Sequence, residues 1–471
     1  MADTVLLTAM TPGRRRLAFY LLLLGAFVPS LNMFIVTIAL PAIREGLAAS
    51  PAETGLIISG YSSAYAVFLI TGGRLGDLFG RRLIFLVGMA GFTLSALVCG
   101  TAPDAETLLA ARVAQGVSAA LTAPQVLAGI RTLFTPAEIP WALNIYGTGL
   151  GVAVAVGQLL GGLLVAADLW GLGWRTAFLV NVPVGLFALA VAPFYVPESG
   201  GRDRPRLDLG GVLLLSTALA SLVVPLSMGR QRQWDAPVLV ALAASPFLGF
   251  AFFAFERWFL RRGGMPLLQA SLLRVRSFRQ GLLVALLFFF TSPFYIFFSI
   301  YLQAGLGEGP LAAGLAVLPY GIANFVGPML ATRVPARWRP WLFGVGMALE
   351  LVGYAATALC VATASIGWLL FAMIFVAGFG QGVAMPEMIH AILRDIPDEH
   401  TGLAAGTMNS TLQLGAAISV AAVGSLFFAV LGNGTSATDY GNALAISMAA
   451  QIAALTLSMV LGLWTPRRRR I

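Results

Sequence analysis

Long runs of apolar residues, separated by short polar or basic stretches, recur from one end of the chain to the other. Each run carries few or no charges and is long enough to cross about 30 Å of hydrocarbon at about 1.5 Å per residue. The pattern predicts an all-α integral membrane protein. The 14 predicted transmembrane helices lie roughly at 17–43, 53–73, 83–103, 107–130, 140–166, 175–196, 210–229, 236–260, 279–303, 310–331, 341–362, 366–392, 402–430 and 440–463.

The composition excludes a soluble protein of this size. Of the 471 residues, 58% are hydrophobic and only 10% are charged. A signal peptide is the alternative for the first run, because Arg14, Arg15 and Arg16 precede it. The run continues for about 27 residues without a clear small-x-small cleavage site, so we expect a retained first helix.

The distribution of arginine predicts the topology. All 29 basic residues are arginine, and with a cytoplasmic N-terminus 24 of them fall in or beside cytoplasmic segments. Four fall outside (Arg44, Arg175, Arg230 and Arg232), and Arg112 lies within a span. The net charge of +9 therefore reflects the topology and places both termini in the cytoplasm. We expect the lipid bilayer as a partner and do not expect nucleic acid.

Internal similarity predicts a duplicated bundle. The segment "IFLVGMA" (84–90) returns as "LFGVGMA" (342–348), and Gly116 and Pro124 have counterparts in Gly378 and Pro386. Spans three and four then match spans eleven and twelve, which implies two six-helix halves with spans seven and eight inserted between them and a substrate path between the halves. The expected parts are a cytoplasmic tail (1–16), an N-terminal bundle (17–196), an inserted segment (197–278), a C-terminal bundle (279–463) and a basic cytoplasmic tail (464–471).

The loop "GGRLGDLFGRRLIF" (72–85) joins spans two and three. Its glycines permit close backbone approach and a tight turn, while Asp77 can pair with Arg81 or Arg82. A cluster of ion pairs like this can stabilise one conformation of the transport cycle and break in another. The alternative is an ordinary cytoplasmic turn whose arginines only set the topology.

These residues resemble the major facilitator superfamily, whose loop signature is G-x-L-x-D-x-x-G-R-R. It is matched at Gly73, Leu75, Asp77, Gly80, Arg81 and Arg82, with Leu78 where a basic residue is frequent. The resemblance narrows to the fourteen-helix drug:proton antiporter family through "RVAQGVSAALTAP" (112–124), "WRTAFLVNVPVG" (174–185), "YLQAGLGEGPLAAGLAVLP" (301–319) and "TMNSTLQLGAAISVA" (407–421). It implies a multi-pass protein of the bacterial inner membrane that acts in multidrug efflux and antibiotic resistance.

The resemblance also implies roles for individual residues. Arg112 corresponds to an arginine implicated in proton coupling, and its cost in hydrocarbon places it in the bundle interior or a hydrated cavity. The alternative is that Arg112 has a structural role and donates hydrogen bonds to helix carbonyl groups. Gln115 and Gln125, on the same helix, are candidate cavity residues.

Span five contains "AVGQLLGGLL" (155–164), which resembles the antiporter motif of the family. Gly157, Gly161 and Gly162 match it, but Gln158 occupies the usual proline position. Small residues of this kind allow two helices to approach closely. The alternative to a role in antiport is that these glycines only serve tight helix packing.

Span nine carries "FFFTSPFYIFFSIY" (288–301), eight of whose fourteen residues are aromatic. By duplication it corresponds to span one and is expected to line the cavity. Phe290, Phe294, Tyr295 and Phe298 are candidates to bind a bulky apolar or cationic substrate, although rings spread around the whole helix must partly pack against protein or lipid.

Proton coupling needs a group that changes charge, and the first helix lacks one. The family pattern L-D-x-T-I-V-N-x-A-L-P aligns with "LNMFIVTIALP" (31–41), which puts neutral Asn32 at the acidic position, where it can still bind substrate, water or a neighbouring helix. The embedded acids are Glu387, with His390 one turn later, and Glu350. We rank Glu387 first, because span twelve is expected to line the cavity and span eleven to be peripheral; a structural carboxylate is the alternative for either.

These observations predict a secondary transporter that exports hydrophobic or amphiphilic compounds, with protons as the coupling ion. The two halves would rock around the cavity, giving alternating access. A uniporter or a differently coupled facilitator is the nearest alternative. A channel is a further, less favoured alternative, and flux that saturates at low turnover would distinguish a carrier from it. A membrane enzyme, a cofactor and a metal site are not indicated, since the chain offers two histidines, two cysteines in apolar spans (Cys99 and Cys360) and no phosphate-binding loop.

Overall fold

The computed structural model describes residues 10–135, 137–198, 208–229, 232–262, 272–335, 337–363, 367–397, 401–432 and 434–463. These residues form helices joined by turns and contain no strand. Outside them lie residues 1–9 of the predicted N-terminal tail, residues 199–207 and 263–271 on either side of the predicted inserted helices, His400 and the basic tail at 464–471. Contacts divide the chain into two units, Met1–Leu267 and Leu268–Ile471, and each is described by itself.

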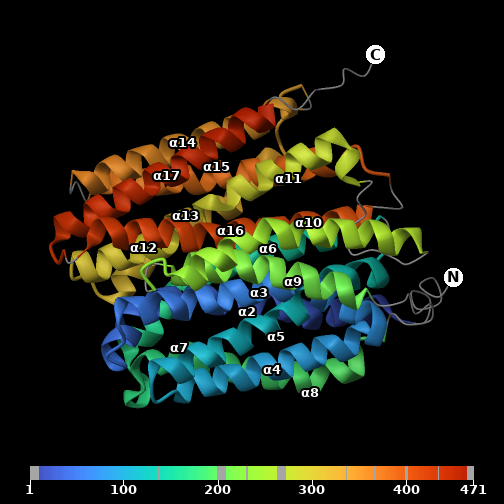
Figure 1. The fold of residues 1–471 in the computed structure, drawn as a ribbon, viewed down its shortest axis with the longest axis horizontal. Coiled ribbons are helices and arrows are strands. Elements are labelled where there is room, and N and C mark those ends of the chain that lie inside the picture. Colours follow the sequence, from blue (N-terminus) through green and yellow to red (C-terminus); the bar gives the residue numbers. More distant parts are fainter. Residues whose placement is uncertain are drawn as a thin grey trace. The chain divides into compact units, whose positions relative to one another are not determined.

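The first unit is a bundle of long helices with two short 3-10 turns (Figure 1). Side-chain caps begin several of them: Thr11 accepts from the Arg14 N–H, and Ser50 and Glu53 form a capping box. The elements are α2 (Pro12–Gly46), α3 (Pro51–Phe79), α4 (Arg81–Thr101), α5 (Ala105–Leu133), α6 (Ile139–Ala167), η1 (Leu169–Gly171), η2 (Gly173–Arg175), α7 (Thr176–Leu179), α8 (Asn181–Tyr195), α9 (Leu209–Met228) and α10 (Ala236–Arg261).

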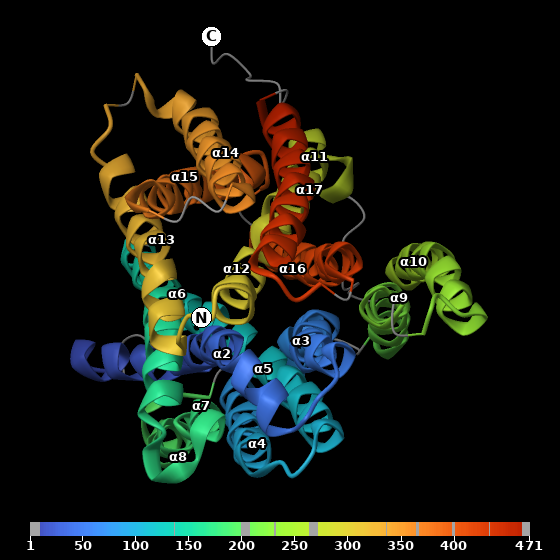
Figure 2. The same cartoon turned by 90° about the vertical axis from the view of Figure 1, so that its left-hand side faces the viewer.

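The helices α9 and α10 correspond to the predicted inserted pair. They pack against each other, and α9 also packs against α3 (Figure 2). Contacts place both helices in the first unit.

The second unit consists of long helices and one span that is broken into four short elements. Its elements are η3 (Leu272–Arg274), α11 (Arg276–Phe288), η4 (Phe289–Thr291), α12 (Phe294–Ile300), η5 (Tyr301–Gly305), α13 (Pro310–Ala331), α14 (Arg339–Ala362), α15 (Trp368–Leu393), α16 (Thr401–Leu431) and α17 (Ala437–Leu463). The predicted ninth span is therefore α11, η4, α12 and η5 in succession rather than one regular helix. Pro293 lies at the break, where its missing N–H cannot continue the helical hydrogen bonds.

Twelve segments of the described chain are long and apolar enough to cross a membrane. The two parts of α3, Glu53–Leu69 and Thr71–Phe79, meet at 48° and would add a thirteenth as one span. Within α9 the apolar segment is shorter, at Gly210–Leu226. The all-α prediction is confirmed for the described residues, whereas the count of fourteen and the cytoplasmic termini stay predictions.

The duplicated sequence segments make equivalent contacts in the two units. A Cβ added at Gly88 of α4 would lie 2.9 Å from the Ser118 carbonyl oxygen of α5, and one added at Gly346 of α14 would lie 2.8 Å from the Gly380 carbonyl oxygen of α15. In the same way, Gly116 of α5 lies against the Tyr61 carbonyl and Gly378 of α15 against the Tyr320 carbonyl. The matching glycines therefore serve the same close helix contacts, as a duplication requires.

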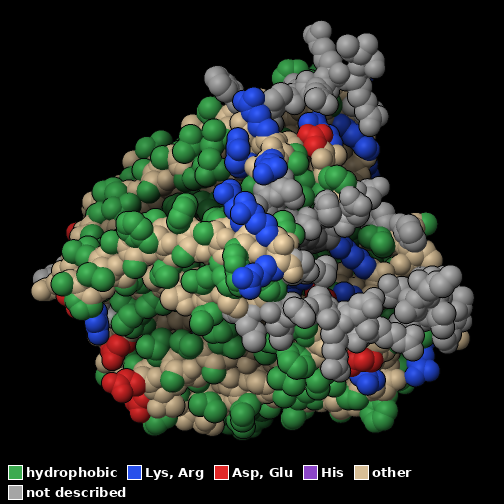
Figure 3. Space-filling model, turned by 45° about the vertical axis from the view of Figure 1, so that its right-hand side comes forward, with side chains coloured by type: hydrophobic (Ala, Val, Ile, Leu, Met, Phe, Trp, Pro, Cys, Tyr) green, Lys and Arg blue, Asp and Glu red, His purple; other side chains and the backbone are tan. Residues whose placement is uncertain are grey.

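Hydrogen bonds bring the basic helix ends of the first unit together. Arg14 donates to the Phe194 carbonyl at the end of α8, Arg82 donates to the Pro193 carbonyl, and Arg15 pairs with Glu138 at the start of α6. Figure 3 shows one face of the molecule, on which hydrophobic side chains (green) are widely exposed and arginine side chains (blue) lie in several separate groups. This distribution is the one expected for helices whose flanks face lipid.

Candidate functional site

A buried arginine organises a polar cluster inside the first unit. Arg112 of α5 is only 1% exposed, and its Nη1 donates to Asn32 Oδ1 of α2 at 2.9 Å and to Gln115 Oε1 at 2.6 Å. Its Nε donates to the Ile57 carbonyl of α3 at 3.2 Å. The guanidinium carbon lies 4.1 Å from the centre of the Tyr61 ring, a cation-π distance. The cluster thus joins α2, α3 and α5 through residues that are far apart in sequence.

The cluster contains a positive charge and no negative one. Among the described residues, Arg112 makes no ion pair with a carboxylate, and the position where the family keeps an acid holds Asn32. Because both amide oxygens accept from Arg112, the amide nitrogens must point elsewhere. Asn32 Nδ2 and Gln115 Nε2 are buried and have no hydrogen-bond partner among the described residues. The cluster therefore contains two buried amide N–H donor groups, on Asn32 and Gln115, that have no acceptor among the described residues.

A buried acid organises a second cluster, inside the second unit. Glu350 of α14 is fully buried, and neither of its carboxyl oxygens makes a hydrogen bond of good geometry with a described residue. Thr291 of η4 is close enough to interact with the carboxyl group. The hydroxyl groups of Tyr295, Tyr320 and Tyr354 also lie within electrostatic range of it. No described cation pairs with this acid.

An amide and hydroxyl network surrounds the Glu350 cluster. Asn324 Nδ2 of α13 donates to Gln381 Oε1 of α15 at 2.9 Å, and Gln381 Nε2 lies 3.4 Å from Thr291 Oγ1. The Tyr354 hydroxyl donates to the Thr291 carbonyl at 3.2 Å. The sequence analysis did not identify Asn324, Gln381, Thr291 or Tyr354 as site residues. The duplication could have suggested Tyr320, because it contacts Gly378 as Tyr61 contacts Gly116.

The aromatic candidates of the ninth span fall into two groups. Phe294, Tyr295 and Phe298 are buried in α12, whereas Phe290 in η4 is half-buried. The Phe294 ring centre lies 5.1 Å from that of Phe298 and 5.3 Å from that of Tyr354, and the Tyr295 and Tyr320 ring centres are 5.1 Å apart. These rings pack among themselves and around Glu350.

The other predicted proton-coupling acid has a different environment. Glu387 of α15 is half-buried, and His390 is exposed. Neither makes a hydrogen bond or an ion pair with a described residue in this structure. Of the two acids, Glu350 is the one that is isolated from water.

The loop motif links three helices of the first unit. Arg81 Nη2 lies 3.2 Å from Asp77 Oδ1, and Arg81 Nη1 donates to the Ala128 carbonyl of α5 at 3.4 Å. Arg82 pairs with Glu198 at 3.6 Å. Gly80 has φ of +101°, a backbone conformation that favours glycine, and Gly73 lies against Pro124. The motif therefore ties the α3–α4 turn to α5 and to the chain after α8.

The small residues of the fifth predicted span bring α6 close to α2. A Cβ at Gly157 would lie 2.8 Å from Phe34 Cβ, and one at Gly161 would lie 2.8 Å from the Ile35 carbonyl oxygen. Gly162 is buried beside them. Gln158, at the position of the family's proline, is fully buried, and neither its Nε2 nor its Oε1 has a described partner.

Gln125 makes packing contacts in this structure. Its Nε2 donates to the Gly72 carbonyl of α3 at 2.8 Å and to the Leu121 carbonyl at 3.0 Å, and its side chain lies against Gly76. Its predicted contact with substrate stays a prediction.

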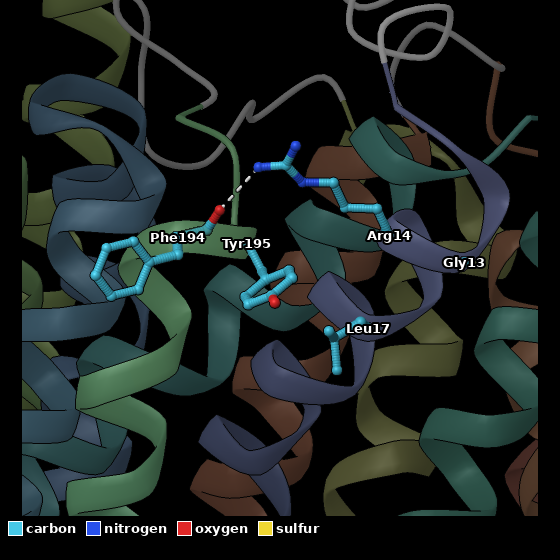
Figure 4. A pocket seen from close by; sticks show the side chains of 5 residues that line it. All are labelled: Gly13, Arg14, Leu17, Phe194 and Tyr195. Atoms are coloured by element: carbon cyan, nitrogen blue, oxygen red, sulfur yellow. Dashed lines mark hydrogen bonds between the residues drawn. The ribbon is translucent and has the colours of Figure 1, made fainter.

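An open pocket of about 570 Å³ lies where α2 begins and α8 ends (Figure 4). Gly13, Arg14, Leu17, Phe194 and Tyr195 line it, and Arg14 Nη2 donates to the Phe194 carbonyl at 3.0 Å. The pocket contains none of the predicted cavity or proton-coupling residues. Within the described part of the chain, no group of three or more His, Cys, Asp or Glu side chains could hold a metal ion.

A family model described as "Major Facilitator Superfamily" matches residues 22–420. The chain is 36% identical to the "Probable actinorhodin transporter" of Streptomyces coelicolor over 438 residues, which cover 91% of this chain and 76% of the relative. It is 34% identical to a puromycin resistance protein of Streptomyces alboniger, with coverage of 94% and 90%. It is 31% identical to the "Multidrug resistance protein Stp" of Mycobacterium tuberculosis, with coverage of 92% and 77%.

Solved structures with a similar fold include a bacterial homologue of the human lysosomal transporter Spinster in an inward-facing, unoccupied conformation. The TM-score is 0.67 at 17% identity, with coverage of 96% of this chain and 97% of the other. The structure of tetrameric PepTSo2 matches with a TM-score of 0.60 at 14% identity, covering 95% of this chain and 97% of the other. The family match and the curated relatives lead to the same superfamily, and the solved structures show a similar fold.

Proposed function

The chain belongs to the major facilitator superfamily of membrane transporters, and from this membership we propose that it exports hydrophobic or amphiphilic compounds from the cell by alternating access. Three relatives are named for the transport of an antibiotic or for resistance to drugs, which supports an export role in the cell membrane. Of the aromatic candidates in the ninth span, half-buried Phe290 leaves part of its ring accessible to such compounds.

We propose that export is driven by protons and that Glu350 is the group that carries them. The observation that supports this is a fully buried carboxyl group without a described cation beside it. A carboxyl group so placed can hold a proton while the site is closed and exchange it when the site opens to water. Glu387, which is half-buried, is the second candidate.

Uniport or a different coupling ion is the second candidate function, and Asn32 favours it. The amide cannot exchange a proton at the position where the family keeps its first-helix acid. Proton coupling in this chain therefore depends on an acid elsewhere.

The test is transport by purified protein in liposomes, with and without an imposed pH gradient. A substrate panel taken from drugs that the intact cells export would supply the probe. Accumulation that the gradient drives, and that Glu350→Gln removes, supports proton antiport. Equal initial rates with and without the gradient, together with failure to accumulate substrate, support the uniporter.

We also propose that α9 and the bent α3 are spans, giving 14 with both termini in the cytoplasm. The arginines at the starts of α2 and α4 support this orientation. Reporter fusions that are active only on one side of the membrane, placed at each terminus, test it.

A further inference from the structure

The hydrogen-bond donors around Arg112 outnumber the acceptors, and this imbalance identifies the kind of group that would complete the cluster. Arg112 Nη1 already serves both amide oxygens, so the Asn32 Nδ2 and Gln115 Nε2 groups are left over. Both side chains are fully buried. Buried donors without partners, next to a buried cation, are costly for the fold.

Among the described residues, no carboxylate pairs with Arg112 to balance this charge. The described titratable groups within electrostatic range of Arg112 are Tyr61 and Cys99. A phenol and a thiol are ordinarily neutral near pH 7. The family resemblance would put a carboxylate at position 32, in contact with Arg112, but Asn32 supplies only the amide oxygen. The cluster keeps the geometry of an ion pair without its negative member.

We propose that the Arg112 cluster is a binding site for a small anionic group, either a carboxylate or comparable anion on the exported compound or a free inorganic anion. The guanidinium provides the charge, the amide nitrogens of Asn32 and Gln115 provide the additional donors, and the Tyr61 ring provides an aromatic wall. The assignment to the substrate rests on the proposed export function. It favours anionic amphiphiles over the cationic compounds that the aromatic sequence pattern suggests.

The test introduces a negative charge beside Arg112 and leaves the arginine in place. Asn32→Asp keeps the size of the side chain and places a carboxylate 2.9 Å from Arg112 Nη1, so it should occupy the site permanently. Gln451→Glu is the control, because it makes the same amide-to-acid change at a fully buried position in the other unit. Size-exclusion chromatography and circular dichroism establish that both variants are folded.

Binding is measured by calorimetry on protein in neutral-lipid nanodiscs, without any gradient, in dilute buffer without added salt. The probes are 2-naphthoate, its neutral isostere 2-naphthamide, and chloride. We expect 2-naphthoate to bind the unaltered protein, 2-naphthamide to bind at least about tenfold more weakly, and Asn32→Asp to weaken 2-naphthoate about ten- to a hundredfold while Gln451→Glu does not.

The outcomes distinguish an organic from an inorganic anion, and they test anion binding separately from proton coupling. Binding of 2-naphthoate that Asn32→Asp removes assigns the site to an organic anion, and chloride binding with the same dependence on residue 32 assigns it to an inorganic one. Equal binding of 2-naphthoate and 2-naphthamide, binding that Asn32→Asp leaves unchanged, or no binding of either anion overturns the proposal. Since no gradient is used, a failure of proton-driven transport in liposomes would reject the proposed coupling and leave this result intact.

Discussion

Asn32 Oδ1 of α2 accepts a hydrogen bond from Arg112 Nη1 of α5 at 2.9 Å, across 80 residues of sequence. The amide therefore orients the guanidinium as an acid would, but it neither neutralises the charge nor exchanges a proton. This pairing separates two tasks that one carboxylate could perform. Asn32 can position Arg112, and the proposed proton exchange would have to be performed by another residue.

Replacement of Asn32 by alanine should weaken the fold more than it changes the pH dependence. The substitution leaves Arg112 Nη1 with Gln115 as its remaining side-chain acceptor. Loss of a buried hydrogen bond to a charged group costs about 1.5–3 kcal/mol, so the melting temperature should fall and transport should slow. The dependence of transport on pH should persist. A flat pH profile in Asn32→Ala protein that is still folded would show that residue 32 takes part in coupling.

The sequence predicted the helices well and the environment of individual side chains less well. Apolar runs, glycines and prolines act locally, so the spans, the correspondence of Gly116 with Gly378 and a close helix contact in the fifth predicted span could be anticipated. That α2 is the partner of α6 in this contact could not. The ranking of Glu387 over Glu350 depended on an assumed peripheral position of the eleventh span. A helix that is apolar on all sides has no periodicity that reveals its packed face. Only packing shows that Glu350 lies among Tyr295, Tyr320 and Tyr354.

Alanine at Gly161 should push α6 away from α2. Its Cβ would lie 2.8 Å from the Ile35 carbonyl oxygen, and backbone cannot move aside cheaply. Overpacking of this kind costs about 1–3 kcal/mol, which a thermal unfolding assay in detergent would detect. Gly151 is the control on the same helix, because nothing lies within 4 Å of an added Cβ there. If Gly161→Ala melts at the same temperature as Gly151→Ala, the close contact does not contribute to stability.

Stability should depend on pH through Glu138, which lies at the start of α6. The N–H and hydroxyl groups of Thr135 donate to its Oε2, and Arg15 lies 3.3 Å away. The Thr135 backbone hydrogen bond is the main cause that holds the pKa of Glu138 below its usual range. The contribution is therefore present above the unfolded pKa of about 4.3 and is lost as the pH falls through the lower folded pKa.

The melting temperatures of Glu138→Gln and unaltered protein should accordingly differ at pH 7 and converge toward pH 3. Glu106→Gln is the control, since Glu106 is exposed and forms no ion pair with a described residue. A difference between Glu138→Gln and unaltered protein that does not change with pH would contradict the assignment.

Asp77→Asn should slow transport and leave stability nearly unchanged. Asp77 and Arg81 are partly exposed, and a pair of this kind contributes about 0–1 kcal/mol. Arg81 also holds α5 through the Ala128 carbonyl, so loosening it alters the α3–α4 turn rather than the fold. We expect a several-fold lower transport rate with unchanged substrate affinity, measured in the same liposomes. Reduced affinity at an unchanged maximal rate would argue against a conformational role.

Glutamine at position 350 should uncouple transport from the proton gradient, whereas glutamine at position 387 should not. Both substitutions keep size and remove the ionisable group, so Glu387→Gln is a matched control in the same unit. Glu350 is fully buried near Thr291 and three tyrosines and pairs with no described cation, so gaining or losing a proton would change the local charge there. Glu387 is half-buried, so water reduces the effect of its charge. Glu350→Gln should still exchange labelled for unlabelled substrate across the liposome membrane but fail to accumulate it against a gradient. If Glu387→Gln loses accumulation and Glu350→Gln retains it, the proton-carrying acid lies on α15, where the sequence pattern alone had put it.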